Sequence, residues 1–183
     1  MSNISFHIFP QTDADNAEVE TLLDTAFGID RRTKTSYRLR EGETALPGLS
    51  FVARDDDGKI IGTISFWQVH IGKTGPDTIL LGPLAVMPGN QASGIGQALM
   101  KHAIAVARKT RHQMIVLVGD GPYYAKVGFK QIPVGQVIMP GPNDPERLLY
   151  LELQEGVINS ANGLIRSPSR YRTAPFRSKP GSR

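Results

Sequence analysis

The chain has 183 residues, 40% hydrophobic and 21% charged, which suits a compact domain and excludes a disordered or fibrous protein. It contains no cysteine, which excludes a disulfide framework, a thiolate metal site and a cysteine nucleophile. The net charge is +4, but segment 160–183 holds six basic residues and no acidic one, whereas residues 1–159 hold 15 basic and 17 acidic residues. We therefore predict one domain over residues 1–159 and a basic, Ser/Pro-rich, partly flexible C-terminal extension over residues 160–183. This extension either adds a final strand through about Tyr171 or trails free.

The first part of the chain predicts two helices. Apolar residues recur at helical spacing over residues 19–27, and Asp15 followed by Glu18 is typical of a capped helix start. This amphipathic helix is expected to end near Gly28. Segment 31–40 predicts a second, short helix.

Strands follow these helices. Residues 49–53 and 59–71 are expected to pair as a hairpin, because the segment 55–58 between them has the sequence Asp-Asp-Asp-Gly of a tight turn. A further strand is predicted over residues 78–86. The early sheet is therefore expected to be antiparallel.

The second half of the chain predicts an α/β unit. Residues 95–107 have the apolar spacing of a helix, and the apolar run 114–118 is typical of a strand buried on both faces. Strand, helix and parallel strand imply a right-handed crossover. Three further elements complete a mixed α/β sheet: a helical turn at 123–126 and strands at 129–132 and 148–153.

A glycine-containing loop precedes the helix at 95–107. Gly94 and Gly96 let the backbone approach a ligand closely, and the first turn of the helix offers free N–H groups and a positive dipole end to a phosphate. The alternative is that both glycines only start a helix that packs tightly on the sheet. The dinucleotide fingerprint is absent because Leu99 stands where its third glycine belongs, and no Gly-Lys-Ser/Thr triplet of a nucleotide hydrolase occurs.

The loop resembles the acyl-CoA loop of the GNAT acetyltransferase superfamily, which has Gln or Arg, two residues, Gly, one residue, and Gly or Ala. The strand before it and segment 123–129, with two tyrosines followed by Gly-Phe, resemble further family elements over about residues 4–155. The resemblance implies an α/β fold with a mixed, mostly antiparallel sheet, a splayed parallel central strand pair and flanking helices. It also implies that acetyl-CoA is bound by Leu84, Ala85, Val86, Gln91, Ala92, Ser93, Gly94, Ile95, Gly96 and Gln97.

Pro83 is an independent reason to expect an interrupted strand. Proline cannot donate a hydrogen bond to a sheet ladder, so normal pairing is excluded at this position. In the GNAT fold the central strand bulges here and the pantetheine arm enters the gap. An ordinary edge or bulge proline is the alternative.

By resemblance, a neutral amine attacks the thioester directly and CoA leaves as a thiolate, without a covalent enzyme intermediate. No G-x-S-x-G motif favours serine chemistry. Tyr124 matches the family's catalytic acid, four residues before Gly128, although its ring could simply pack, and Tyr123 could act instead. A main-chain N–H near Val86 is expected to polarise the carbonyl group.

The general base is not determined by the sequence. Asp120 and His70 are weak candidates, because a turn-stabilising aspartate and an exposed strand histidine are commoner explanations. No catalytic metal is expected, since the histidines form no ligand spacing. Four arginines on the early helices favour either an anionic acceptor or a solvated helix face: Arg31, Arg32, Arg38 and Arg40.

The sequence thus predicts an acetyl-CoA-dependent N-acetyltransferase that acts on a primary amine, either a small molecule or a peptide. The alternative is a catalytically silent CoA-binding regulatory module whose basic tail recruits an acidic partner. Six scattered charges disfavour a nucleic-acid role. No apolar run long enough for a membrane helix and no secretion signal occur, so we expect a cytoplasmic protein, and the resemblance suggests a homodimer.

Overall fold

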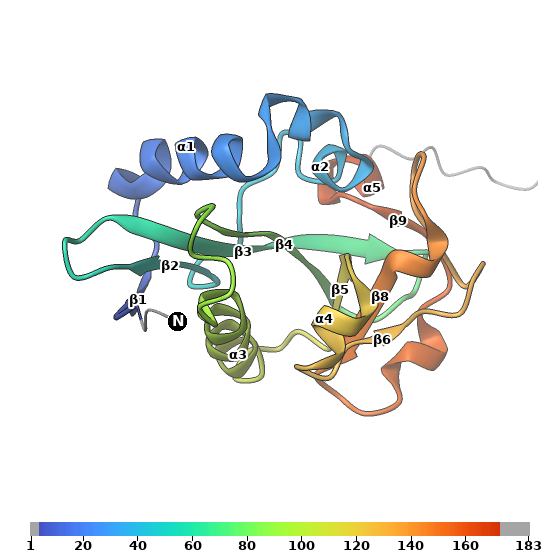
Figure 1. The fold of residues 1–183 in the computed structure, drawn as a ribbon. Coiled ribbons are helices and arrows are strands. Elements are labelled where there is room, and N and C mark those ends of the chain that lie inside the picture. The colour runs from blue at the N-terminus through green and yellow to red at the C-terminus, as the bar shows by residue number, and fades with distance from the viewer. Residues whose placement is uncertain (1–3, 173–183) are drawn as a thin grey trace, which may run out of the picture.

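The computed structural model describes residues 4–172, which build one mixed sheet with helices on both faces (Figure 1). Neighbouring strands follow the order β1-β2-β3-β4-β5-β8-β6, and β9 pairs with both β3 and β7. Two of the strand pairs, β4–β5 and β7–β9, are parallel and the others are antiparallel. The strands are β1 (His7–Pro10), β2 (Ser50–Arg54), β3 (Ile60–Ile71), β4 (Thr78–Val86), β5 (Met114–Val118), β6 (Lys130–Gln131), β7 (Val137–Ile138), β8 (Leu148–Glu152) and β9 (Gly163–Arg166).

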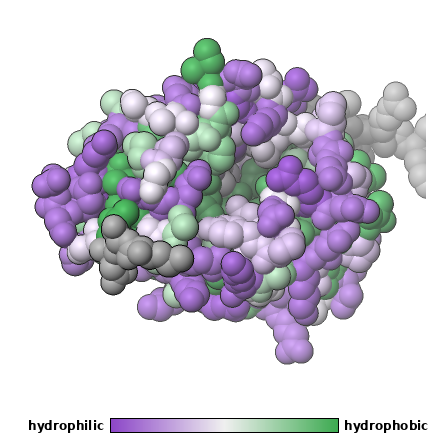
Figure 2. All heavy atoms as spheres, viewed as in Figure 1, coloured by the Kyte–Doolittle hydropathy of each residue, from purple (hydrophilic) through white to green (hydrophobic). Residues whose placement is uncertain are grey.

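Two helical layers cover the sheet, α1 and α2 on one face and α3 on the other (Figure 1). Alternation along β2 explains both contacts, because Phe51 and Ala53 belong to the core under α3 whereas Val52 belongs to the core under α1. Figure 2 shows hydrophobic residues in the middle of a face that is mostly hydrophilic, with further hydrophobic residues at its top and right-hand edge. The α-helices are α1 (Asn16–Phe27), α2 (Thr35–Arg38), α3 (Ile95–Ala107), α4 (Gly121–Ala125) and α5 (Pro168–Arg172), and 3-10 turns span Asp13–Asp15, Ile29–Thr33, Pro145–Arg147 and Val157–Ser160.

The predicted mixed α/β fold is confirmed, and β4, β5 and α3 have the predicted boundaries. The predicted helix at 31–40 is wrong in part. It is divided into the 3-10 turn Ile29–Thr33 and α2, because Lys34 between them is extended (φ −67°, ψ 142°). Strands β1 and β7 were not predicted, since both are short and β1 is largely exposed, which leaves little hydrophobic alternation.

The predicted capping role of Asp15 is also corrected. Its carboxylate accepts hydrogen bonds from the Thr12 N–H (2.8 Å) and from Arg54, and it makes no side-chain cap to α1. The Thr12 N–H, the Thr12 hydroxyl and the Arg54 guanidinium together hold the pKa of Asp15 below its usual value, against the opposing effect of burial.

Asp15 should make stability depend on pH. A carboxylate with a lowered pKa in the folded state stabilises the protein above its unfolded pKa, near 4, and loses this effect as the pH falls through the folded value. Asp15→Asn is therefore expected to lower the free energy of unfolding most above pH 4, and the difference from wild type should shrink below it. Urea unfolding at pH 7 and pH 3 checks this; a difference that stays constant would contradict it.

The described part of the predicted extension, residues 160–172, lies against the sheet. Ile165 in β9 is buried and pairs with Ile71, and the Tyr171 ring stacks on the His70 ring with centroids 4.4 Å apart. The division at residue 159 stays a prediction, and the end of the extension lies outside the described residues. Within residues 4–172, no helix has the length and hydropathy needed to cross a membrane.

Candidate functional site

The parallel strands β4 and β5 pair over only three residues. Thr78, Ile79 and Leu80 face residues 114–116, and no pairing continues beyond Leu80 in the described chain. At the same level β4 bulges, because Gly82 and Pro83 together oppose the single residue Ser65 of β3. The interruption predicted from Pro83 is therefore confirmed, and the two strands splay apart.

A cleft of about 590 Å³ lies where these strands separate. Leu80–Leu84 of β4 line one side, and Val118–Asp120 at the end of β5 line the other. The Met87 N–H donates to the Ile61 carbonyl of β3 at 2.9 Å. Because successive N–H groups of a strand point to opposite sides, the N–H groups of Leu84 and Val86 point away from β3, towards the gap.

Gly94 begins α3 in the left-handed conformation (φ 83°), without a side-chain cap. A Cβ at Gly94 would meet no atom within 4 Å, so this glycine is required by its backbone conformation and not by lack of space. The Ala98 N–H makes the first helical bond, to the Gly94 carbonyl (3.0 Å). The N–H groups of residues 95–97 therefore form the open first turn, which suits an anion.

Gly96 is required for a different reason. A Cβ there would clash with the Tyr123 hydroxyl, which lies against the first turn of α3. The Gln97 side-chain amide also donates to the Tyr123 carbonyl (3.3 Å) and ties α3 to α4. Upstream, the N–H groups of Asn90 and Ser93 close two turns, and Gln91 and Ala92 are exposed in the loop between β4 and α3.

Tyr124 lines the cleft. Its ring lies edge-on to the rings of Tyr123 and Phe129, with centroids 5.2 and 5.8 Å apart, and a Cβ at Gly119 would overlap it. Burial raises the pKa of Tyr124 to about 12, so the phenol stays protonated at neutral pH. Burial also raises the pKa of Tyr123.

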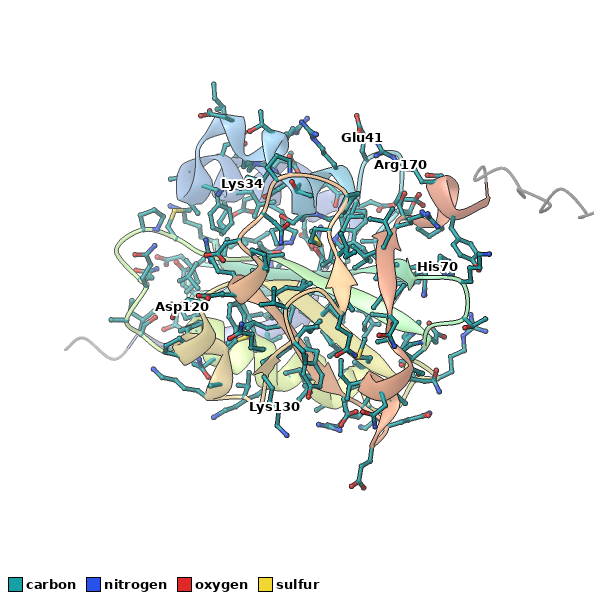
Figure 3. The ribbon with its side chains drawn as sticks, turned by 90° about the vertical axis from the view of Figure 1, so that its right-hand side faces the viewer. Lys34, Glu41, His70, Asp120, Lys130 and Arg170 are labelled. Carbon is teal, nitrogen blue, oxygen red and sulfur yellow. The ribbon has the colours of Figure 1, made fainter. Side chains whose placement is uncertain are left out.

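The two weak base candidates lie far apart (Figure 3). Asp120 lines the cleft, but its carboxylate caps α4 by accepting the Tyr123 N–H at 3.1 Å, which is the structural role that the sequence also allowed. His70 lines neither this cleft nor the cavity described next, and it pairs with Arg166 of β9. The structure does not bring the two together.

A second cavity, of about 920 Å³, lies under α1 and α2. Tyr37, Arg40 and Pro83 line both this cavity and the cleft, so the two spaces meet there. Sequence reasoning missed Tyr37, and also Trp67, which lines the second cavity. No local pattern marks either residue as part of a site.

One alternative for the four early arginines was a solvated helix face, and this prediction is wrong for Arg31 and Arg40, which are buried. Arg31 is 3% exposed and donates to Asp24 (2.8 Å) and Glu20. Arg40 is 9% exposed, and its guanidinium lies 3.7 Å from the centroid of the Tyr37 ring. Burial lowers the pKa of Arg40 to about 10, which leaves it charged at neutral pH.

No group of three or more His, Asp or Glu side chains within residues 4–172 is placed to hold a metal ion. The features that the structure gathers are instead a strand gap with free backbone groups, an open helix N-terminus and a protonated tyrosine. They suit a long ligand with amide groups and phosphates, such as a pantetheine nucleotide.

The chain matches the model of the acetyltransferase (GNAT) family over residues 16–129. It is 35% identical over 131 residues to the uncharacterized N-acetyltransferase YjhQ of Escherichia coli K12, which is 70% of each protein. The crystal structure of the GNAT family N-acetyltransferase YhbS from E. coli in complex with CoA has the same fold (TM-score 0.77, 22% identity, 96% of both chains). A GNAT family acetyltransferase from Brucella melitensis in complex with acetyl-CoA has a TM-score of 0.59 at 27% identity, over 80% of this chain and 96% of that one. The match to the family model and the identity to YjhQ show that the chain belongs to the GNAT acetyltransferase family.

Proposed function

We propose that the protein transfers an acetyl group from acetyl-CoA to a primary amine, by direct attack within a ternary complex. Two observations carry the proposal: the gap between β4 and β5, and the open first turn of α3 at Gly94. Tyr123 links them, since it lines the cleft in the gap and its hydroxyl lies against Gly96 in that turn. Two structural neighbours, from E. coli and B. melitensis, were crystallised with CoA and acetyl-CoA. Family membership and this gap together support acetyl-CoA as the acyl donor.

The first turn of α3 would bind the phosphates, since its N–H groups have no helical partner and carry the positive end of the dipole. The exposed N–H and carbonyl groups of Leu84 and Val86 would pair with the amides of the pantetheine arm. The Val86 N–H would also stabilise the oxyanion that forms on the thioester carbonyl. These contacts involve the backbone, so no side chain is needed to make them.

Tyr124 would protonate the leaving thiolate. In the reaction the acceptor nitrogen forms a bond to the carbonyl carbon, the carbon–sulfur bond breaks, and the nitrogen loses one proton to water. The pKa of the phenol, about 12, is higher than that of the thiol, about 8.5, so the thiol is the stronger acid. The phenol therefore transfers its proton to sulfur only as the carbon–sulfur bond breaks, and it then regains a proton from solvent. Both Tyr123 and Tyr124 line the cleft, and the deeper burial of Tyr124, with its larger rise in pKa, supports this role for Tyr124.

Thermal unfolding with and without acetyl-CoA tests the proposed donor site. Ligand at about 100 times its dissociation constant should raise the free energy of unfolding by roughly 2.7 kcal/mol, which raises the melting temperature by about 5–10 °C for a domain of this size. Gly94→Glu should abolish this shift, since a carboxylate would occupy the anion site. Gly58→Glu is the matched control, because Gly58 is also exposed with positive φ (80°) but lies in the β2–β3 hairpin. Equal shifts in both variants would reject the donor site.

Turnover separates the enzyme from the silent CoA-binding module. The enzyme should release free thiol from acetyl-CoA only when an amine is added, and a panel of amines followed with a thiol reagent measures this. Binding of acetyl-CoA without thiol release from any amine would favour the module.

A further inference from the structure

The second cavity contains a buried cation without a counter-ion. Within residues 4–172, Arg40 forms no ion pair, and its Nε donates only to the Ser36 carbonyl (3.2 Å). By contrast, Arg31 beside it has two carboxylate partners. A buried charge without a partner is costly, so a counter-ion from outside the chain is expected to stabilise it.

Two further polar groups in this cavity lack partners. In the described part of the chain, Tyr37 Oη and Ser50 Oγ are the buried side-chain atoms without a hydrogen bond, and both residues line the second cavity. Such orphaned groups are rare in native proteins and call for an explanation. A bound ligand with acceptor oxygens would explain both of them together with Arg40.

The acidic residues of the cavity are mostly engaged elsewhere. Glu20 holds Arg31 and Arg32, Glu41 lies 3.6 Å from Arg170, and Glu43 accepts the Ser169 N–H. Figure 3 shows Glu41 and Arg170 next to each other. None of these three carboxylates forms an ion pair with Arg40, although Glu20 lies near enough to raise the pKa of Arg40 against the effect of burial.

The aromatic rings hold the Arg40 guanidinium in place. It stacks over the Tyr37 ring at 3.7 Å and lies 5.8 Å from the centroid of the Trp67 ring. An oriented guanidinium presents two parallel N–H groups, which match the two oxygens of a carboxylate. A charge fixed by stacking also loses little side-chain entropy on binding.

We propose that Arg40 and Tyr37 bind the carboxylate of the acceptor, which is a small amine of the α-amino-acid class. The inference rests on the proposed function and names its substrate class. Arg40 lies where the cavity meets the cleft, beside the bulge at Pro83. If Arg40 holds the carboxylate there, the amine reaches a thioester in the cleft only when few bonds separate the amine from the carboxylate. An α-amino acid meets this condition.

Matched pairs of probes test this subsite directly. Each L-α-amino acid is compared with its α-carboxamide, which keeps the amine and side chain but removes the negative charge. Thermal unfolding is measured with and without saturating CoA. At least one amino acid should bind tenfold or more tightly than its amide; if none binds more tightly than its amide, the proposal is wrong.

Arg40→Gln should raise the dissociation constant of the preferred amino acid about 10- to 100-fold, the range expected for a hydrogen-bonded charge, and leave that of the amide unchanged. Arg40→Lys keeps the charge but loses the paired donors, so its effect should be intermediate. It also serves as the test if Arg40→Gln does not fold. Arg108→Gln, at the exposed end of α3, is the control and should keep the wild-type preference. An unchanged preference in both folded Arg40 variants would overturn the assignment.

Tyr37→Phe separates a binding role from a structural one. Tyr37 Oη makes no hydrogen bond of normal geometry in the free protein, so its removal should leave the melting temperature unchanged or raise it. The affinity for the amino acid should fall about threefold to tenfold, as for one lost hydrogen bond. A lowered melting temperature with unchanged affinity would assign the hydroxyl to stability instead.

The two proposals fail in different ways. If acetyl-CoA neither binds nor turns over, the proposed function fails. The carboxylate subsite is then still tested, because binding of amino acids and their amides is also compared in the absence of CoA. If acids and amides are acetylated with equal kcat/KM, the carboxylate subsite fails while the acetyltransferase stands.

Discussion

Tyr124→Phe is expected to lower kcat about 100-fold, within the range for loss of a general acid, and to leave the dissociation constant of acetyl-CoA within about twofold. The substitution removes only the hydroxyl, so the edge-on contacts of the ring with Tyr123 and Phe129 remain. Without the acid, the thiolate must leave unprotonated or take a proton from water. Steady-state kinetics with calorimetric binding of acetyl-CoA measures both quantities.

Tyr123→Phe is the matched variant, because the two tyrosines are adjacent and both have raised pKa values. The Tyr123 hydroxyl lies against Gly96, so its loss should weaken acetyl-CoA binding more than turnover. A larger loss of kcat in Tyr123→Phe than in Tyr124→Phe would transfer the acid role to Tyr123.

The pH profile gives a second check on the same variant. An acid must be protonated to act, and burial raises the pKa of Tyr124 to about 12. Tyr124 is therefore active at all lower pH values, and it should cause no fall in kcat up to about pH 10. A decrease centred near pH 8 that disappears in Tyr124→Phe would show that the phenol titrates much lower.

Leu99→Ala is expected to lower the free energy of unfolding by about 3–4 kcal/mol. Leu99 is fully buried on α3, and it packs against Gly62 of β3, where a Cβ would lie 3.0 Å from its Cδ1 atom. Glycine has no side chain that could move into the space left by the lost methyl groups, so a cavity should remain. The midpoint of urea unfolding, at constant m-value, measures the effect.

Lys101→Ala, two residues further along α3 on its exposed side, is the control and should change the free energy of unfolding by less than about 0.5 kcal/mol. A loss below 1 kcal/mol for Leu99→Ala would show that α3 is not held by this contact. The sheet would then contribute little to fixing the position of the first turn of α3 at Gly94.

Local sequence was sufficient for the strand-loop-helix unit around the gap. The boundaries of β4 and α3 follow from hydrophobic periodicity over short windows, and periodicity depends on which face of each element is buried. Pro83 predicted the interruption of β4 because a missing N–H is a property of the residue itself. Gly94 was predicted as a ligand-approach glycine, and the structure shows that its positive φ is a further, local requirement for glycine.

Contacts between distant segments decided the rest. Gly96 was predicted as a ligand-approach glycine, but its space is taken by the Tyr123 hydroxyl from α4, which no local pattern reveals. Similarly, β9 joins the sheet through two residue pairs with β3, although its segment has the composition of a mobile tail. Asp120 and His70 looked equivalent as bases, yet only Asp120 lines the cleft.

The sequence by itself determined the fold class and the family resemblance and predicted a backbone-led donor site, because glycine, proline and periodic apolar residues act on their own immediate backbone. Only the tertiary structure points to the proposed acceptor subsite. Arg40 is indistinguishable in the sequence from the exposed Arg38 two residues earlier. It is buried against Tyr37 of α2 and Trp67 of β3 because the turn that follows α2 packs near β3, a distant segment of the chain. This burial is the basis of the proposed subsite.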